Sequence, residues 1–225
     1  MYPQIREALA PTRSRATVLR QKTAHKRSYG RNSETYMSMV HKWRFHYYGI
    51  IHKVFENAGE FDFPIVFAPL EKYLDGFTVE YHDIGDLPSD LLSDLRHEDE
   101  VEEGWNFIHE GTIHIFYDAN VHPKRQRFTI AHEWGHVFQK LDWEFKQDME
   151  AIPNVHEQKR IIESVANHFA AYYLVPFPLF RCEYQEAMNA RGNGGLHARL
   201  AERFEVSEEV INHYMLNFRK RLIKQ

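Results

Sequence analysis

The segment His132-Glu133-Trp134-Gly135-His136 brings two imidazoles and one carboxylate into five consecutive residues. If the segment is helical, residues i and i+4 lie one turn apart on one face, so His132 and His136 can bind the same zinc ion. Glu133 would then lie beside the open coordination position and could accept a proton from water. The pattern predicts a metal-dependent hydrolase with Glu133 as the catalytic base.

This motif needs support from its surroundings, because the chain contains 15 histidines and 32 acidic residues. The predicted helix has an apolar stripe on the side opposite His132, Glu133 and His136, as a helix packed on a core requires. Gly135 costs about 1 kcal/mol in a helix interior, which indicates that another backbone approaches closely there. The stripe consists of Ile130, Trp134, Val137, Phe138 and Leu141.

A third ligand is offered by the later segment 161–176, IIESVANHFAAYYLVP, which has the periodicity of a second helix. Glu163 and Asn167 stand at i and i+4, away from its apolar face, with the small Ala170 and Ala171 beside them. Glu163 would complete a His₂Glu zinc site, and the Asn167 amide oxygen could accept the free ring N–H of a ligand histidine. The alternative is that both residues belong to a solvated helix face.

Several further elements are predicted to position these residues. Residues 106–120 indicate a β-hairpin turning at Glu110-Gly111. Thr112–Tyr117, if exposed, could pair with an extended peptide and place it across the metal; a central position in the sheet would exclude this role. Before the hairpin, the predicted elements are a helix over 35–58 ending at Gly59, a short helical segment to Gly76 and a strand over 77–84. After it come a helix from Pro123 to Leu141 and a helix from Val155 to Val175 capped by Asn154 and Glu157. Two short helices follow 191–195, with Ser207 as an N-cap.

The segment RFTIAHEWGH (127–136) and the spaced residues Glu163, Asn167 and Pro176 resemble the ImmA/IrrE family of metallopeptidases. The resemblance is strong over about residues 105–180, and around the metal it is similar to thermolysin-like gluzincins. It implies His132, His136 and Glu163 as zinc ligands and Glu133 as base. It also implies a protein substrate, a helix-turn-helix transcriptional repressor whose cleavage releases mobile-element or stress genes. Trp134 and Val165 depart from the common family residues without changing this chemistry.

We expect an α+β, zincin-like domain with a small, mostly antiparallel sheet, two metal-bearing helices and helical extensions at both ends. The expected division is a basic arm at 1–34, the peptidase domain at 35–180 and a helix-turn-helix-like unit at 181–225. Residues 1–31 carry eight Lys or Arg and one acid, whereas the rest carries 20 basic and 31 acidic residues. Such an arm could contact nucleic acid, although a solvated tail is the simpler interpretation.

Other sequence features bear on the compartment and on rival functions. No apolar run approaches the ~18 residues of a membrane span, and the N-terminus lacks a secretory h-region. A single cysteine, Cys182, excludes an internal disulfide, so we expect a cytoplasmic protein. The alternatives left open are a non-catalytic DNA- or repressor-binding regulator with a structural or vestigial metal site, a protease toxin, and manganese in place of zinc. His109, His114, Tyr117 and His168 are candidates for oxyanion stabilisation, and none is assigned that role.

Overall fold

The computed structural model describes residues 34–59, 63–88, 103–189 and 195–222. The predicted basic arm therefore lies outside the described residues, apart from Glu34, which begins the first helix. The helices are α2 (Glu34–Ala58), α3 (Ala68–Tyr73), the 3₁₀ turn η1 (Ile84–Asp86), α5 (Pro123–Leu141), α6 (Trp143–Glu150), α7 (Val155–Leu174), α8 (Phe177–Asn189), α9 (Leu196–Arg203) and α10 (Glu208–Leu222). The strands are β1 (Thr78–Asp83), β2 (Gly104–His109) and β3 (Thr112–Tyr117).

The three strands form one sheet in the order β1-β3-β2. β2 and β3 make the predicted antiparallel hairpin, but β1 pairs with β3 in parallel. The α+β class is confirmed, whereas the expectation of a mostly antiparallel sheet is wrong, since one of the two strand pairs is parallel. Parallel strands need a long crossover, and here it includes residues 84–103 and β2 itself. Local sequence patterns reveal a hairpin but not a crossover of that length.

The central position of β3 overturns the expectation that this strand binds a peptide. Every residue of Thr112–Tyr117 has a partner in β1 on one side and in β2 on the other. Both hydrogen-bonding edges of β3 are therefore occupied. In the described part of the sheet β2 is an edge strand, because it pairs with β3 alone.

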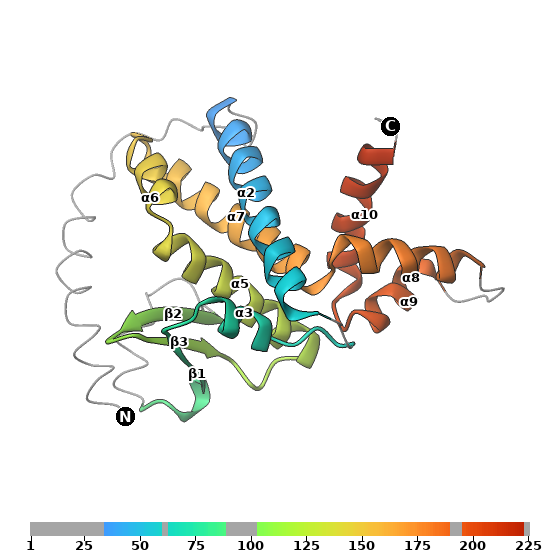
Figure 1. Ribbon diagram of the computed structural model, residues 1–225, viewed down its shortest axis with the longest axis horizontal. Coiled ribbons are helices and arrows are strands. Elements are labelled where there is room, and N and C mark those ends of the chain that lie inside the picture. Colours follow the sequence, from blue (N-terminus) through green and yellow to red (C-terminus); the bar gives the residue numbers. More distant parts are fainter. Residues whose placement is uncertain (1–33, 60–62, 89–102, 190–194, 223–225) are drawn as a thin grey trace.

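Three helices are layered on this sheet, as Figure 1 shows. α5 packs against β2 and β3, α7 packs on α5, and α2 crosses α7. The sequence sets the ends of these helices locally. Pro123 opens α5, and the Asn154 side chain accepts a hydrogen bond from the backbone N–H of Glu157 at 3.1 Å at the start of α7. Gly59 follows α2 with a φ of 80°, the left-handed conformation typical of a helix stop.

The close approach predicted at Gly135 joins α5 to α7. A Cβ atom at this position would lie 3.0 Å from the Cα and 3.2 Å from the carbonyl oxygen of Ala166. Only glycine fits there without moving the backbone of α7. The expected approach of a second backbone is confirmed, and the contacting residue is Ala166 on α7.

The C-terminal helices α8, α9 and α10 lie together at the side of the molecule away from the sheet (Figure 1). The N-cap at Ser207 is confirmed, since its hydroxyl accepts from the N–H of Val210 at 3.3 Å. Helix α8 was not among the predicted elements. Pro178 lies in its first turn, where proline is tolerated. The predicted boundary at 181 falls inside α8, and the domain division stays a prediction. Among the described helices none is long and apolar enough to cross a bilayer.

Candidate metal centre

Helices α5 and α7 bring the three predicted ligand side chains together. The Nε2 atoms of His132 and His136 lie 2.9 Å apart. The Glu163 carboxylate lies 3.3 Å from His132 Nε2 through Oε2 and 3.6 Å from His136 Nε2 through Oε1. The i,i+4 spacing on α5 fixes the first pair, and the contact of Gly135 with Ala166 brings the second helix near enough for Glu163 to reach both imidazoles.

This triangle fits a tetrahedral metal ion. Zinc bonds of 2.0–2.1 Å at tetrahedral angles separate ligand atoms by about 3.3–3.4 Å. The observed separations are 2.9 Å between the two nitrogens and 3.3 and 3.6 Å from them to the carboxylate, so small shifts bring the three side chains to these distances. The side chains of His132 and His136 are 16% and 15% exposed, whereas that of Glu163 is 43% exposed. The imidazoles are therefore held in the protein while the carboxylate side remains open to solvent. Two imidazole nitrogens and one glutamate carboxylate form one of the ligand sets found in catalytic zinc sites.

Each histidine is oriented through its other ring nitrogen. His132 Nδ1 lies 3.0 Å from Asn167 Oδ1, and His136 Nδ1 lies 2.9 Å from Gln139 Oε1. Gln139 is itself held, because its amide nitrogen donates to the carbonyl oxygen of Ile162 at 2.9 Å. Each amide oxygen accepts from an Nδ1–H, which leaves Nε2 as the ring nitrogen that faces Glu163 and can bind a metal.

Asn167, proposed from the sequence as the partner of a ligand histidine, lies beside His132, whereas sequence reasoning missed Gln139 beside His136. Gln139 is only 4% exposed and lies three residues after His136 on the same helix. A polar residue one turn beyond His136, next to the apolar Phe138, was the available signal. Its amide connects α5 to the backbone of α7 and so ties the two halves of the centre together.

The charges of the two glutamates at this centre favour the binding of a cation. Burial raises the pKa of Glu163, but hydrogen bonds from His132 and His136 outweigh it, so the pKa lies well below its ordinary value. Burial lowers the pKa of His136, but the hydrogen bond to Glu163 and the charge of Glu133 outweigh that effect and raise it. The carboxylates that favour a proton on an imidazole also favour a metal dication in its place.

Glu133 lies in a tight space between α5 and the edge strand β2. It is 5% exposed, and the Asn106 amide donates to Glu133 Oε2 at 2.6 Å. A Cβ atom on Gly104 would lie 3.2 Å from Glu133 Oε1 and 2.4 Å from Thr129 Cγ2. Gly104 is therefore needed for β2 to approach the helix here. The burial of Glu133 could not be predicted from the sequence, because Gly104 and Asn106 are distant from it along the chain and come close only in the folded structure.

Lys140 extends the hydrogen-bonded chain that begins at Glu133. Its ammonium donates to Asn106 Oδ1 at 2.6 Å, and the same Asn106 side chain donates to Glu133. Although Lys140 as a whole residue is exposed, its ammonium lies against β2, where it also donates to the Asn106 carbonyl oxygen at 2.5 Å. Burial lowers the pKa of Lys140 to about 8, partly opposed by the charge of Glu133. The chain fixes the Asn106 amide so that its nitrogen faces the carboxylate.

We expect the Lys140 ammonium to titrate near pH 8 because burial disfavours its charge. The folded pKa lies below the unfolded value, so the unfolded chain binds more protons between the two, and stability rises with pH in that window. Nitrogen-15 NMR of the lysine side chains should show one resonance titrating near pH 8 and missing in Lys140→Met. If the resonance lost in that variant titrates with the ordinary lysines, this account of Lys140 is wrong.

The oxyanion candidates fall in different places. His109 and His114 alternate along their strands with Asn106, Ile113 and Ile115, which face the helices, so they occupy the opposite face of the sheet. The remaining two are Tyr117, at the register position opposite Gly104, and His168, whose Nδ1 lies 2.6 Å from the carbonyl oxygen of Ser164. No catalytic role is assigned to any of them.

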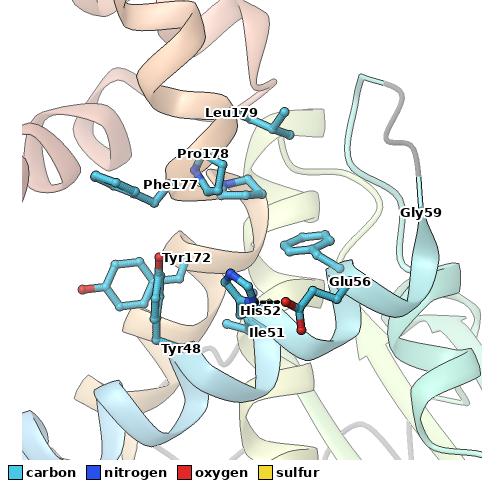
Figure 2. A pocket seen from close by; sticks show the side chains of 11 residues that line it. Tyr48, Ile51, His52, Glu56, Gly59, Tyr172, Phe177, Pro178 and Leu179 are labelled. Carbon is cyan, nitrogen blue, oxygen red and sulfur yellow. Dashed lines mark ion pairs between the residues drawn. The ribbon is translucent and has the colours of Figure 1, made fainter.

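A separate, largely apolar cavity of about 260 Å³ lies between α2 and the junction of α7 with α8 (Figure 2). Its walls include Tyr48, Ile51, Tyr172 and Phe177. His52 and Glu56 also line it and form an ion pair in which His52 Nδ1 lies 3.2 Å from Glu56 Oε1. It shares no residue with the His–Glu triangle. The cavity therefore does not belong to the candidate metal centre.

An α+β domain with a His₂Glu triangle and a carboxylate beside it has the arrangement of a metal-dependent hydrolase. The sequence profile of a peptidase family, the IrrE N-terminal-like domain, matches residues 76–216. The chain therefore belongs to this metallopeptidase family, which confirms the resemblance seen in the sequence. The match begins just before β1 and extends into α10, so it includes the sheet and both helices of the centre.

Two individual proteins are similar to parts of the chain. The radiation response metalloprotease IrrE of Deinococcus radiodurans is 34% identical over 93 residues, which are 41% of this chain and 27% of that protein. A solved structure described as a Mycobacterium tuberculosis transcriptional regulator superposes with a TM-score of 0.51 and 16% identity, covering 81% of this chain and 51% of that one. At that identity the likeness concerns the fold alone. The chain spans about a quarter of the first protein's length and about half of the second's.

Proposed function

We propose that this chain is a zinc-dependent metallo-endopeptidase in which His132, His136 and Glu163 bind the metal and Glu133 is the catalytic base. The observation that carries the proposal is the triangle of ligand atoms with Glu133 held beside it by Asn106. A merely structural metal site has no need of a carboxylate in this position. Membership of a metallopeptidase family supports the same reaction class.

The proposed chemistry assigns one task to each group. When bound, zinc supplies Lewis-acid activation of water and of the scissile carbonyl. Glu133 takes the proton from the attacking water on a carboxylate oxygen and passes it to the nitrogen of the leaving amine. Asn106 holds one carboxylate oxygen through its amide, which limits the rotation of Glu133 away from the water. Asn167 and Gln139 keep the two imidazoles in the tautomer that binds metal.

The position of β2 suggests how a peptide would be presented. β2 is an edge strand of the described sheet and carries Asn106, which contacts the proposed base. An extended peptide that pairs with this edge would run past Glu133, with backbone hydrogen bonds supplying affinity. This role replaces the one expected for β3, whose edges are both occupied.

The proposed substrate is a helix-turn-helix transcriptional repressor, which rests on the family resemblance. A proteome-wide analysis of protein N-termini should detect new termini in such proteins when the wild-type chain is expressed in its host, and none with His132→Ala. New termini only in unrelated proteins would favour the toxin alternative and reject the repressor. An absence of new termini, combined with metal binding, would contradict the endopeptidase proposal.

A non-catalytic regulator that binds DNA remains the rival from another class. Its supporting features are the basic residues 1–31 and the capped helix pair α9–α10. Retention of the chain on duplex DNA, measured over a series of salt concentrations, separates the two functions. A steep loss of binding with salt indicates several phosphate contacts and favours the regulator. Weak retention that does not depend on salt favours the peptidase.

A further inference from the structure

Strands β1 and β3 carry a second group of metal-binding side chains. Glu80 lies directly opposite His114 in the parallel register, and His82 lies two residues beyond Glu80, so all three share one face of the sheet. Ile113 and Ile115 alternate with His114 and point into the core beneath the helices. The group therefore occupies the face opposite the one that carries Asn106 and meets Glu133.

The donor atoms of this group form a compact triangle. His82 Nε2 lies 3.1 Å from His114 Nδ1. Glu80 Oε2 lies 3.4 Å from His114 Nδ1 and 3.5 Å from His82 Nε2. As at the first centre, a tetrahedral zinc ion separates nitrogen and oxygen ligands by about 3.3–3.4 Å. The triangle has the same His₂Glu composition as the candidate metal centre on α5 and α7, here called the helix site. Its three distances are within about 0.3 Å of the tetrahedral separation.

Aromatic rings hold the two imidazoles in place. His82 stacks on Phe116 and His114 stacks on Phe107, each with ring centroids 4.6 Å apart and planes inclined by 26°. The side chains of His82 and His114 are 11% and 9% exposed, whereas that of Glu80 is 44% exposed. The nitrogen donors therefore lose little conformational freedom on binding an ion, and the carboxylate marks the side from which an ion can enter.

We propose that Glu80, His82 and His114 form a second metal site, which binds a divalent transition-metal ion such as zinc and links β1 to β3. Two imidazole nitrogens select this class of ion, because calcium and magnesium prefer oxygen ligands alone. Lying on the other face of the sheet from Glu133, the ion has a stabilising role and no part in hydrolysis.

A metal-free explanation of the cluster is a hydrogen bond between the two imidazoles beside a carboxylate. One neutral ring can donate to the other at 3.1 Å, and no ion is needed for that contact. The two explanations differ in stoichiometry. The second site predicts one zinc ion that persists when the helix site is removed, whereas the hydrogen bond predicts none.

The test is a zinc titration of the full chain by isothermal calorimetry in four variants. Wild type should bind two zinc ions, His132→Ala one, His82→Gln one, and the combination of both substitutions none. The matched control is His52→Gln, which removes a histidine that pairs with a carboxylate, Glu56, at 3.2 Å outside either group. It should bind as many ions as wild type.

Thermal melting supplies a second readout that does not depend on activity. In the His132→Ala background, zinc at a hundredfold excess over its Kd should raise the Tm by about 5–10 °C, since it binds only the folded chain. The added His82→Gln change should abolish this shift. If the combined variant binds zinc and shifts its Tm as His132→Ala does, the proposal of a second site is wrong.

The Glu80→Gln variant provides a test that does not depend on the folding of His82→Gln. If His82→Gln loses its native circular dichroism spectrum, zinc binding by Glu80→Gln tests the second site instead, because this change keeps the size of a side chain at the surface. Even the loss of an outer partner of a ligand weakens metal binding by about 10–100-fold, so Glu80→Gln should weaken zinc binding by at least about tenfold. Wild-type affinity in Glu80→Gln, measured in the His132→Ala background, would contradict the proposal. Loss of the helix-site ion alone concerns the proposed peptidase and leaves this site untouched.

Discussion

Glu133→Gln is expected to lower the rate of peptide hydrolysis by about 10²–10⁴-fold while the metal content stays at the wild-type level. Glutamine has the size of glutamate, and its amide oxygen can still accept the hydrogen bond from Asn106. It cannot take a proton from water. The measurement is kcat/KM on a protein substrate that the wild-type chain cleaves, together with metal analysis of both proteins.

The matched control for this change is Glu157→Gln, at a second buried glutamate in the first turn of α7. Glu157 belongs to neither His–Glu group, so its variant should cleave at close to the wild-type rate. A Glu133→Gln enzyme with activity within about tenfold of wild type would remove Glu133 from its assigned role. Equal losses in both variants would indicate damage to the fold and not loss of a base.

Gly135→Val should destabilise the protein by about 2–3 kcal/mol, a loss of about 4–12 °C in Tm. Any Cβ at this position lies 3.0 Å from the Ala166 Cα, so α5 and α7 must move apart. The gain in helix propensity on replacing glycine is below about 1 kcal/mol and does not offset overpacking against a backbone. Because Glu163 is on the displaced helix, zinc affinity should fall together with the Tm.

The control is the same substitution at Gly49 within α2, where a Cβ would meet no atom within 4 Å. Gly49→Val should change stability by less than about 1 kcal/mol, because only helix propensity is altered. Differential scanning calorimetry and a zinc titration of both variants provide the comparison. If Gly135→Val melts and binds zinc like Gly49→Val, the contact between the two helices is less demanding than the structure indicates.

The features predicted from sequence are those that depend on neighbours along the chain. The i,i+4 spacing of His132 and His136, the cap at Asn154 and the hairpin turn are all encoded within a few residues. Glu110 and Gly111 both adopt positive φ, 46° and 78°, as a two-residue hairpin turn requires. The face that carries Glu163 was also readable, since helical periodicity extends over the whole segment 161–176.

Features that depend on strand pairing could not be read from the sequence. The parallel register that sets Glu80 opposite His114 joins residues 34 positions apart, with β2 between them in the chain. The burial of Glu133 depends on β2 lying beside α5, where Gly104 makes room for the carboxylate. The sheet order also decided which strand has a free edge, and this made β2 and not β3 the candidate to pair with a peptide.

Metal content, measured by elemental mass spectrometry on purified wild type, His132→Ala and Glu163→Ala, shows whether these residues bind one ion. Each variant should contain one zinc ion fewer per chain than wild type, because each loses a ligand of the same ion. The hydrolytic centre would then consist of His132, His136 and Glu163. A wild type that stays free of metal after zinc is supplied, or variants that keep the full wild-type content, would contradict this assignment.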